Sequence, residues 1–355
     1  MEWFKVKSFQ GDYSVQSFNE VKDIVEAIKN IPNGIFIIDS NIANIYPQFN
    51  LLLKHALLIN AVETEKTLSG ITHVLDFMRE NNCTKDSIII AIGGGIIQDI
   101  VTFASHIYYR GIKWVYIPTT LLSMSDSCIG AKCGINYNNF KNQLGAFHSP
   151  SQVLICTKFV DTLTDDDILS GYGEIFKLML ICSSKQFYNM QCNIISHGFK
   201  NQYLASLIRQ SLEVKKRIIE IDEYERDLRR ILNYGHTFGH SLESVTNYEV
   251  PHGVAVAWGI DVANYVSLYK GIISSVDFNM LHHFVALYYS YQVSHKISEV
   301  DLVNGTKRDK KVSNGKLNMA LLYKIGDLKI VPVEFDLLGD IINEYMREYN
   351  VIYWD

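Results

Sequence analysis

Short apolar runs alternate with amphipathic stretches in the N-terminal part of the chain. Residues 35–38, 57–59 and 87–92 are predominantly apolar, which is typical of buried strands. Residues 21–28 and 67–78 instead carry apolar side chains at helical spacing. Strands that alternate with helices are joined by right-handed crossovers, so the pattern predicts a parallel sheet covered by helices.

The same alternation continues for one more unit and then ends. A helical run at 100–109 precedes a strand at 113–117. Long helical patterns then fill residues 165–269, and the chain closes with a strand-like stretch at 316–322 and a helix at about 334–349. The pattern therefore changes from α/β to mainly helical part-way along the chain.

The length supports two domains. A chain of 355 residues is about twice as long as a typical single domain. We predict an α/β domain of the Rossmann-like, parallel-sheet type over residues 1–157 and a helical domain over residues 158–355.

Three consecutive glycines follow the apolar run at 87–92 and precede the helical run. Without side chains, Gly93, Gly94 and Gly95 allow main-chain N–H groups to approach a phosphate at the start of a helix. The pyrophosphate of a dinucleotide is the natural ligand for such a loop. The sequence does not match the Gly-x-Gly-x-x-Gly pattern, and a tight turn remains the alternative interpretation.

Polar side chains follow the other predicted strands at the same end. Asp39 and Asn41 come after the first strand, and Glu63 and Lys66 come after the second. Ligands of parallel sheets bind at the carboxyl ends of strands, so we expect these residues near the glycine loop. The segment 118–136, which is rich in hydroxyl groups and small residues, is predicted to line a ligand.

The histidines of the second half indicate a metal site. His236 and His240 are four residues apart, so they project from one face of a helix, and His252 begins the next helical pattern. Glu174 and Lys177 lie on one face of an apolar helix, where a buried carboxylate needs a cation or a metal. Structural histidines and an ordinary surface ion pair are the alternatives.

Composition and charge limit the classes of ligand. The net charge is −5, which argues against a general nucleic-acid surface, and no apolar run is long enough to span a membrane. The start of the chain lacks the pattern of a signal peptide, and the six cysteines are scattered without a Cys-x-x-Cys pair, so we predict a cytoplasmic protein. Seven cations nevertheless lie in or beside motif-like segments and predict an anion pocket for a phosphate ester: Arg110, Lys132, Lys141, Lys177, Lys215, Arg229 and Lys310.

Several short motifs occur in order along the chain. They are Gly-Gly-Gly-x-x-x-Asp at 93–99, Tyr-x-Arg-Gly at 108–111, Pro-Thr-Thr-Leu-Leu at 118–122, Asp-Ser-x-Ile-Gly at 126–130, Lys-Asn-x-Leu-Gly-Ala at 141–146, Gly-x-x-Glu-x-x-Lys at 171–177, Leu-Asn-x-Gly-His-Thr-Phe-Gly-His at 232–240, His-Gly-x-Ala-Val-Ala at 252–257 and Asp-Lys-Lys at 309–311. In this order they resemble the motifs of 3-dehydroquinate synthase and related sugar phosphate cyclases. The resemblance covers nearly the whole chain.

The resemblance implies an NAD-binding N-terminal domain, a helical metal- and substrate-binding C-terminal domain, and an active site between them. It implies that Glu174, His236 and His252 bind Zn²⁺ or Co²⁺. His240, which the spacing alone pairs with His236 as a ligand, is instead implied to act in proton transfer at the substrate.

The resemblance also implies which residues contact the other ligands. NAD would contact Asp39, Asn41, Glu63, Lys66, Gly94, Gly95, Ile96, Asp99, Thr119, Thr120, Leu122, Asp126, Ser127, Lys132 and Lys141. The sugar phosphate would contact Asp126, Lys132, Asn142, Lys177, Lys215, Arg229, Asn233, His240 and Lys310. Arg110 would reach across a homodimer.

The implied reaction belongs to the shikimate pathway. NAD transiently oxidises a ring hydroxyl of 3-deoxy-arabino-heptulosonate 7-phosphate, phosphate is eliminated, the ketone is reduced again, and an aldol step closes the carbocycle of 3-dehydroquinate. NAD is regenerated in each turnover.

Five positions depart from the usual dehydroquinate synthase pattern: Gln98, Ala131, Cys133, Phe140 and Val254. They leave open a sister cyclase that acts on glucose 6-phosphate, giving 2-deoxy-scyllo-inosose, or on sedoheptulose 7-phosphate, which the motif ending at His148 also resembles. An NAD-dependent polyol dehydrogenase of the related iron-activated superfamily and a non-catalytic sugar phosphate-binding descendant also stay open. Asn233 and His240 keep the dehydroquinate-type pattern.

Overall fold

The chain forms two compact units in the computed structural model, which describes residues 1–138, 140–307, 312–313 and 316–354. Unit 1 comprises Met1–Thr164 and Gln202–Tyr224, and unit 2 comprises Asp165–Asn201 and Glu225–Asp355. Residues 158–164 and 202–224, which the sequence analysis assigned to the C-terminal domain, therefore belong to the first unit.

Unit 1 is built on a seven-stranded sheet with the strand order β1-β2-β9-β6-β5-β3-β4. Only β1 and β2 pair antiparallel among these strands, so the sheet is mostly parallel, as the alternating pattern predicted. The strands are β1 (Glu2–Val6), β2 (Tyr13–Phe18), β3 (Gly34–Asp39), β4 (Ala56–Ile59), β5 (Ile88–Gly93), β6 (Lys113–Pro118) and β9 (Gln152–Cys156).

The register of the parallel strands aligns their carboxyl ends. Ile38 of β3 pairs with Ile92 of β5, and Gly93 of β5 pairs with Pro118 of β6. The loops after these strands therefore start at one edge of the sheet. This alignment brings together the predicted ligand-binding segments, which are far apart in the sequence.

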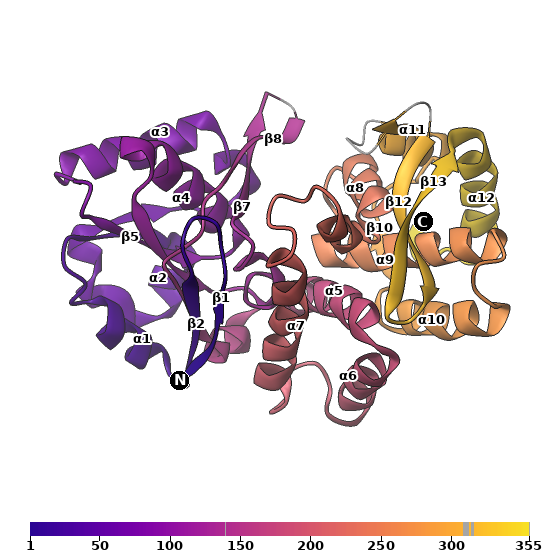
Figure 1. Ribbon diagram of the computed structural model, residues 1–355, viewed down its shortest axis with the longest axis horizontal. Helices are drawn as coiled ribbons and strands as arrows, with labels where there is room; N and C mark the ends of the chain where they lie inside the picture. The colour runs from indigo at the N-terminus through magenta and orange to yellow at the C-terminus, as the bar shows by residue number, and fades with distance from the viewer. Residues whose placement is uncertain (139, 308–311, 314–315, 355) are drawn as a thin grey trace. The chain divides into compact units, whose positions relative to one another are not determined.

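Five α-helices accompany this sheet among the described residues of unit 1 (Figure 1). Helix α1 illustrates why these segments are helical. Its apolar residues recur at helical spacing and are all buried: Val21, Ile24, Val25 and Ile28. The helices are α1 (Val21–Ile28), α2 (Ser40–Ile45), α3 (Leu68–Glu80), α4 (Gly95–Ile107) and α7 (Leu204–Ile219).

The sequence pattern did not predict every strand. β1 and β2 are short and contain polar residues, and β9 was not predicted although four of its five residues are apolar and buried. β7 (Lys132–Tyr137) and β8 (Phe140–Phe147) form an antiparallel hairpin where only a ligand-lining segment was expected.

Unit 2 is mainly helical, as predicted, and also contains an antiparallel sheet (Figure 1). Its helices are α5 (Asp165–Cys182), α6 (Ser184–His197), α8 (His236–Val245), α9 (His252–Tyr269), α10 (Ser275–Tyr288), α11 (Glu299–Lys307) and α12 (Phe335–Glu348). Its strands are β10 (Tyr291–Val293), β11 (Val312–Ser313), β12 (Lys316–Lys324), β13 (Asp327–Glu334) and β14 (Ile352–Trp354).

Helix α9 is the core of unit 2, because its residues from Gly253 to Ser267 are all buried. Glycines allow two helices to approach it closely. A methyl group on Gly173 of α5 would overlap the carbonyl oxygen of Gly253, and one on Gly259 of α9 would overlap that of Gly235. Gly239 of α8 also faces the backbone of α9, where a Cβ would lie 2.9 Å from the Ala255 oxygen.

We predict that Gly253→Ala destabilises the protein, because the added methyl group would overlap the carbonyl oxygen of Ser170. Overpacking of this kind typically costs about 1–3 kcal/mol in the free energy of unfolding. Gly339→Ala in α12 is the matched control, because its Cβ meets no atom within 4 Å. Urea unfolding should show a loss for the first variant and none for the second; equal stabilities would contradict the packing account.

Candidate metal and cofactor sites

Three side chains of unit 2 converge on one point. The Oε1 atom of Glu174 lies 3.2 Å from Nε2 of His252 and 3.4 Å from Nε2 of His236. The ligand atoms of the three residues all lie within 4.8 Å of one another. One carboxylate and two imidazoles form the kind of three-ligand set that catalytic zinc sites use, so the donor types fit a divalent cation.

The elements of unit 2 position each member of this triad. Glu174 follows Gly173, at the point where α5 contacts α9. His236 and His252 are the first residues of α8 and α9. Gly235, at φ +78°, adopts the left-handed conformation that lets the chain enter α8 here, so it precedes the helix.

Both histidines are oriented by an acceptor on their other nitrogen. Nδ1 of His236 lies 3.2 Å from the carbonyl oxygen of Tyr234, and Nδ1 of His252 lies 3.3 Å from Oε2 of Glu243. A carbonyl or carboxylate oxygen accepts a hydrogen bond, so each Nδ1 carries a proton. Both Nε2 atoms are left to face Glu174.

The pKa values of all three triad residues are shifted from their usual values. Burial raises the pKa of the Glu174 carboxyl, but Lys177 and His236 outweigh it, and the pKa lies well below its usual range. Burial and the Lys177 ammonium lower the pKa of His236. Burial also lowers the pKa of His252, whereas Glu243 and Glu174 raise it to about 10. The two carboxylates that attract a proton to His252 would equally attract a divalent cation, which binds in place of that proton.

The buried pair of Glu174 and Lys177 confirms the expectation from their apolar helix. Their side chains are 1% and 2% exposed, and Lys177 donates a hydrogen bond to Oε2 of Glu174. Oε1 is left for an ion, so the carboxylate can serve the lysine and the metal together.

His240 lies beside the triad but outside it. Its ring centroid is 5.3 Å from that of His236 and 5.9 Å from that of His252. It groups with Glu243 and His252 as a second set of potential ligands, and it is exposed. The two histidines that the spacing pairs on one helix face thus belong to different sets.

Two further glutamates were missed by the sequence analysis. Glu243 follows His236 at i+7 and His240 at i+3, on the same face of α8, and this periodicity was an available signal. Glu225 accepts a hydrogen bond from Nδ2 of Asn233, and no pattern in the sequence singled it out. Arg229, which was predicted, is buried in the same short segment, Leu228–Asn233.

The glycine loop of unit 1 lies at the carboxyl edge of the sheet. Gly94 precedes the first residue of α4, Gly95, so main-chain N–H groups at the start of this helix can bind an anion. A Cβ on Gly94 would lie 2.9 Å from Thr120, whereas one on Gly95 meets no atom within 4 Å. The Cα of Gly95 therefore faces open space.

Charged residues predicted for the cofactor gather beside this loop. Lys66 donates to Asp99 at 2.9 Å and lies 3.9 Å from Glu63, and Lys141 lies 3.5 Å from Glu63. Asp99 also accepts from the main-chain N–H of Gly134 at 3.1 Å. Burial lowers the pKa of Lys66, but Asp99 and Glu63 raise it above its usual value, so the lysine is cationic.

Lys215 is brought to Asp126 from a distant part of the chain. Its Nζ donates to the carbonyl oxygen of Asp126 at 2.7 Å and lies 3.1 Å from Oδ1. Lys215 is on α7, and Asp126 is in the π-helical segment Ser123–Ser127. This contact is one reason that α7 belongs to unit 1.

The remaining predicted residues of unit 1 lie around the same loops or at the surface. Asp39 accepts from the N–H of Asn41 at 2.9 Å and so caps α2. Thr120 contacts Ser123, and Arg110 ends a turn with φ +69°. Other predicted positions are Ile96 in α4, Thr119 and Leu122 after β6, Ser127 in the π-helical segment, Lys132 in β7 and Asn142 in β8; Lys310 lies outside the described residues.

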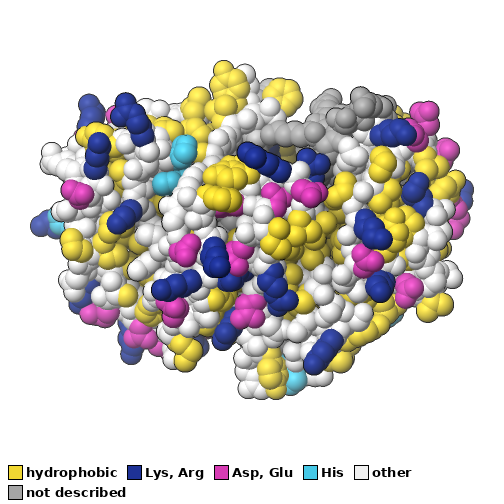
Figure 2. Space-filling view, in the orientation of Figure 1, with side chains coloured by type: hydrophobic (Ala, Val, Ile, Leu, Met, Phe, Trp, Pro, Cys, Tyr) yellow, Lys and Arg dark blue, Asp and Glu magenta, His cyan; other side chains and the backbone are white. Residues whose placement is uncertain are grey.

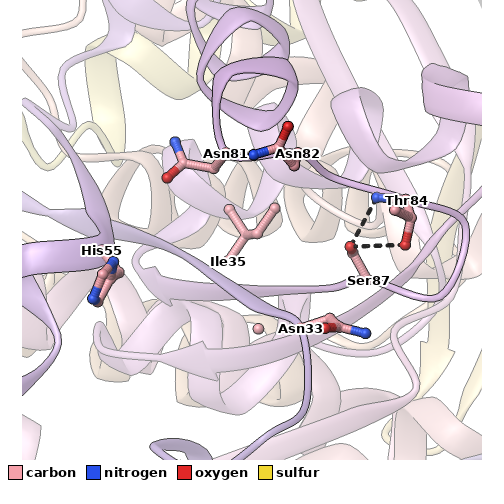
Figure 3. A pocket seen from close by; sticks show the side chains of 8 residues that line it. Asn33, Ile35, His55, Asn81, Asn82, Thr84 and Ser87 are labelled. Carbon is pink, nitrogen blue, oxygen red and sulfur yellow. Dashed lines mark hydrogen bonds between the residues drawn. The ribbon is translucent and has the colours of Figure 1, made fainter.

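A pocket of about 250 Å³ opens at the other end of the sheet (Figure 3). Asn33, Asn81, Asn82 and Ser87 are among its lining residues, and β3 and β5 begin beside it. No residue predicted for a ligand lines it. We therefore place the candidate chemistry at the carboxyl edge and the triad, where the polar groups converge.

The described side chains on the face drawn in Figure 2 form no large patch of a single charge. Basic and acidic side chains are interspersed over the face drawn in Figure 2. Among the described residues, no helix combines the length and the apolar character needed to cross a bilayer.

Comparison with known proteins identifies the family. The model of the 3-dehydroquinate synthase N-terminal domain matches residues 56–170, and that of the C-terminal domain matches residues 171–312. The chain belongs to the 3-dehydroquinate synthase family. It is 34% identical to a 3-dehydroquinate synthase of Thermoanaerobacter pseudethanolicus over 342 residues, which cover 93% of this chain and 95% of that protein.

Solved structures of sugar phosphate cyclases share the fold. A 2-deoxy-scyllo-inosose synthase complexed with carbaglucose 6-phosphate, NAD⁺ and Co²⁺ has a TM-score of 0.86 and 23% identity, covering 97% of this chain and 99% of that chain. The 2-epi-5-epi-valiolone synthase of Streptomyces hygroscopicus, with NAD⁺ and Zn²⁺ bound, has a TM-score of 0.85 and 24% identity, covering 98% and 100%. These likenesses confirm the predicted fold class.

The geometry of the triad predicts which variants of the protein retain metal. Glu174→Ala and His236→Ala each remove one of the three candidate ligands, so the purified proteins should contain little metal after dialysis. His240→Ala should retain metal like the wild-type protein and lose turnover. Elemental analysis of the three variants decides between the assignments, and a metal-free His240→Ala protein would restore His240 as a ligand.

The open space at Gly95 predicts a selective loss of cofactor binding. The methyl group of Gly95→Ala contacts no protein atom, so thermal stability should be retained, while a phosphate could no longer approach the backbone closely. We expect NAD⁺ affinity to fall at least tenfold in calorimetric titration. Unchanged NAD⁺ affinity would contradict the prediction that the pyrophosphate binds at this loop.

Proposed function

We propose that the protein is a 3-dehydroquinate synthase, which converts 3-deoxy-arabino-heptulosonate 7-phosphate into 3-dehydroquinate and phosphate. The observation that carries this proposal is the triad of Glu174, His236 and His252 in a chain that aligns with a 3-dehydroquinate synthase over 93% of its length. The family match also favours a cyclase over the polyol dehydrogenase alternative.

We propose that the triad holds Zn²⁺ or Co²⁺ and that the loop at Gly94 and Gly95 holds the pyrophosphate of NAD. When bound, NAD supplies reversible oxidation of a ring hydroxyl and the metal polarises the oxygen of that group. Lys177 keeps Glu174 ionised, because its ammonium lies against the second carboxylate oxygen. The carboxylate is therefore ready to bind a cation at neutral pH.

The cationic side chains are assigned to the charges of the substrate. A phosphate ester and a carboxylate need several positive donors in fixed directions. Lys215 is fixed by Asp126, and Arg229 is buried within a turn of Asn233. Lys132, Asn142 and Lys310 complete the proposed set.

His240 is assigned the proton transfer. Its imidazole is accessible and lies next to His236 and His252, whose Nε2 atoms face the proposed metal. An imidazole that holds no metal can accept a proton from a substrate hydroxyl at a ring nitrogen.

Release of phosphate tests the proposal. With NAD and Zn²⁺, the purified protein should release phosphate from 3-deoxy-arabino-heptulosonate 7-phosphate without accumulating NADH, because the cofactor is reoxidised in each turnover. Release only from glucose 6-phosphate or sedoheptulose 7-phosphate would assign the protein to a sister reaction. Net NADH formation from a simple polyol would contradict both cyclase proposals.

A sister cyclase is the second candidate, and particular side chains favour it. Gln98 is buried in the glycine-loop helix, and Cys133 lies in β7 where threonine is usual in dehydroquinate synthases. Burial raises the pKa of the Cys133 thiol to about 12, so it is a neutral, apolar group. These residues change the shape and polarity of the proposed site more than its charge.

We also propose that the protein acts as a cytoplasmic homodimer. All six cysteines are free, which fits a reducing compartment. Tyr109 and Arg110, the residue that the family resemblance assigns to the dimer, both adopt positive φ, a conformation that costs free energy and clusters at functional sites. Light scattering on a sizing column should give twice the mass of 40.6 kDa, and a monomer would contradict the dimer.

A further inference from the structure

One side chain joins the glycine-loop helix to the segment that carries Asp126. Gln98 lies in the first turn of α4, and it is 5% exposed. Its Nε2 donates to the carbonyl oxygen of Ser127 at 2.7 Å, and its Oε1 accepts from the hydroxyl of Ser127 at 2.6 Å. Both ends of the buried amide are thus bound by a single residue far along the chain.

Ser127 is the last residue of the π-helical segment Ser123–Ser127. Such single π-helical turns are rare and occur frequently at functional sites. Asp126 precedes Ser127, and Lys215 binds both its carbonyl oxygen and its carboxylate. Gln98 and Lys215 therefore hold adjacent residues of this segment from two different helices.

A second side chain near the start of α4 also makes contacts with distant segments. Asp99, the neighbour of Gln98, binds Lys66 at 2.9 Å and the N–H of Gly134 at 3.1 Å. Gln98 is the link from this turn to the π-helical segment. Without its amide, the hydroxyl and carbonyl of Ser127 would lose the partners that fix their directions.

We propose that Gln98 is a positioning residue, which locks the π-helical segment to the glycine loop and so fixes the carboxylate of Asp126 relative to the bound dinucleotide. Asp126 can then accept hydrogen bonds from ribose or sugar hydroxyl groups in a single orientation. The inference rests on the proposed function, because it assumes a dinucleotide at the glycine loop.

Gln98→Met tests this positioning role. Methionine fills a similar space but cannot form the two hydrogen bonds that the Gln98 amide makes with Ser127. We expect the dissociation constant of NAD⁺, measured by calorimetric titration of the zinc-loaded protein, to rise about tenfold, since misplacing a site group by about 1 Å can cost up to a hundredfold. kcat should fall by a similar factor, with a smaller change in the KM of the sugar phosphate.

Gln98→Glu should lose at least as much NAD⁺ affinity as Gln98→Met, because its second carboxylate oxygen replaces the N–H donor and faces the carbonyl oxygen of Ser127, where two acceptors repel. Thr102→Val is the matched control: Thr102 lies one turn further along α4, is 1% exposed, and its hydroxyl has no hydrogen-bond partner among the described residues. It should keep NAD⁺ affinity and kcat within about twofold of wild type.

Wild-type affinity and kcat in Gln98→Met would overturn the inference, and so would equal losses in Gln98→Met and Thr102→Val, which would indicate general packing. A wild-type protein that binds no NAD⁺ would instead overturn the proposed function. The two failures are distinguishable because the titration with NAD⁺ requires no substrate.

Discussion

The close approach of α5 and α8 to α9 is the constraint on which the candidate metal site depends. Glycines occupy the crossing points because any larger residue would place a methyl group on a carbonyl oxygen of the opposite helix. Glu174 follows one of these glycines directly, and His236 follows another. The packing of the backbone thus decides that a carboxylate and two imidazoles meet.

The electrostatics of unit 2 follow from that packing. A buried carboxylate is costly unless it is paired, and Glu174 is paired on one oxygen by Lys177 and faces two imidazoles with the other. Tyr234 and Glu243 bind the outer nitrogens of the histidines and direct their Nε2 atoms inward. In unit 1 the candidate site depends on strand register instead. The parallel strands β3, β5 and β6 end level with one another, so the loops that follow them lie at one edge of the sheet.

Much of this arrangement was predictable from the sequence, because periodicity reports burial. The apolar runs predicted β3 and β5, and the apolar surroundings of Glu174 and Lys177 predicted their burial. Short strands with polar residues, such as β1, gave no such signal. Contacts that join distant segments, such as Gln98 with Ser127, depend on tertiary packing and have no local pattern.

The spacing of histidines was informative but ambiguous. His236 and His240 do share one face of α8, yet Nε2 of His236 meets Glu174, while His240 groups with Glu243. A helix pattern shows which side chains share a face, but it does not show which neighbouring helix supplies the remaining ligand. That choice is made by the glycine contacts with α9.

X-ray absorption spectroscopy of the zinc-loaded protein tests the central claim most directly, because it counts the imidazoles bound to the metal. The account predicts two imidazoles and at least one carboxylate oxygen, with one imidazole lost in His252→Ala and none lost in His240→Ala. Three imidazoles in the wild-type protein, or an unchanged spectrum in His252→Ala, would contradict it.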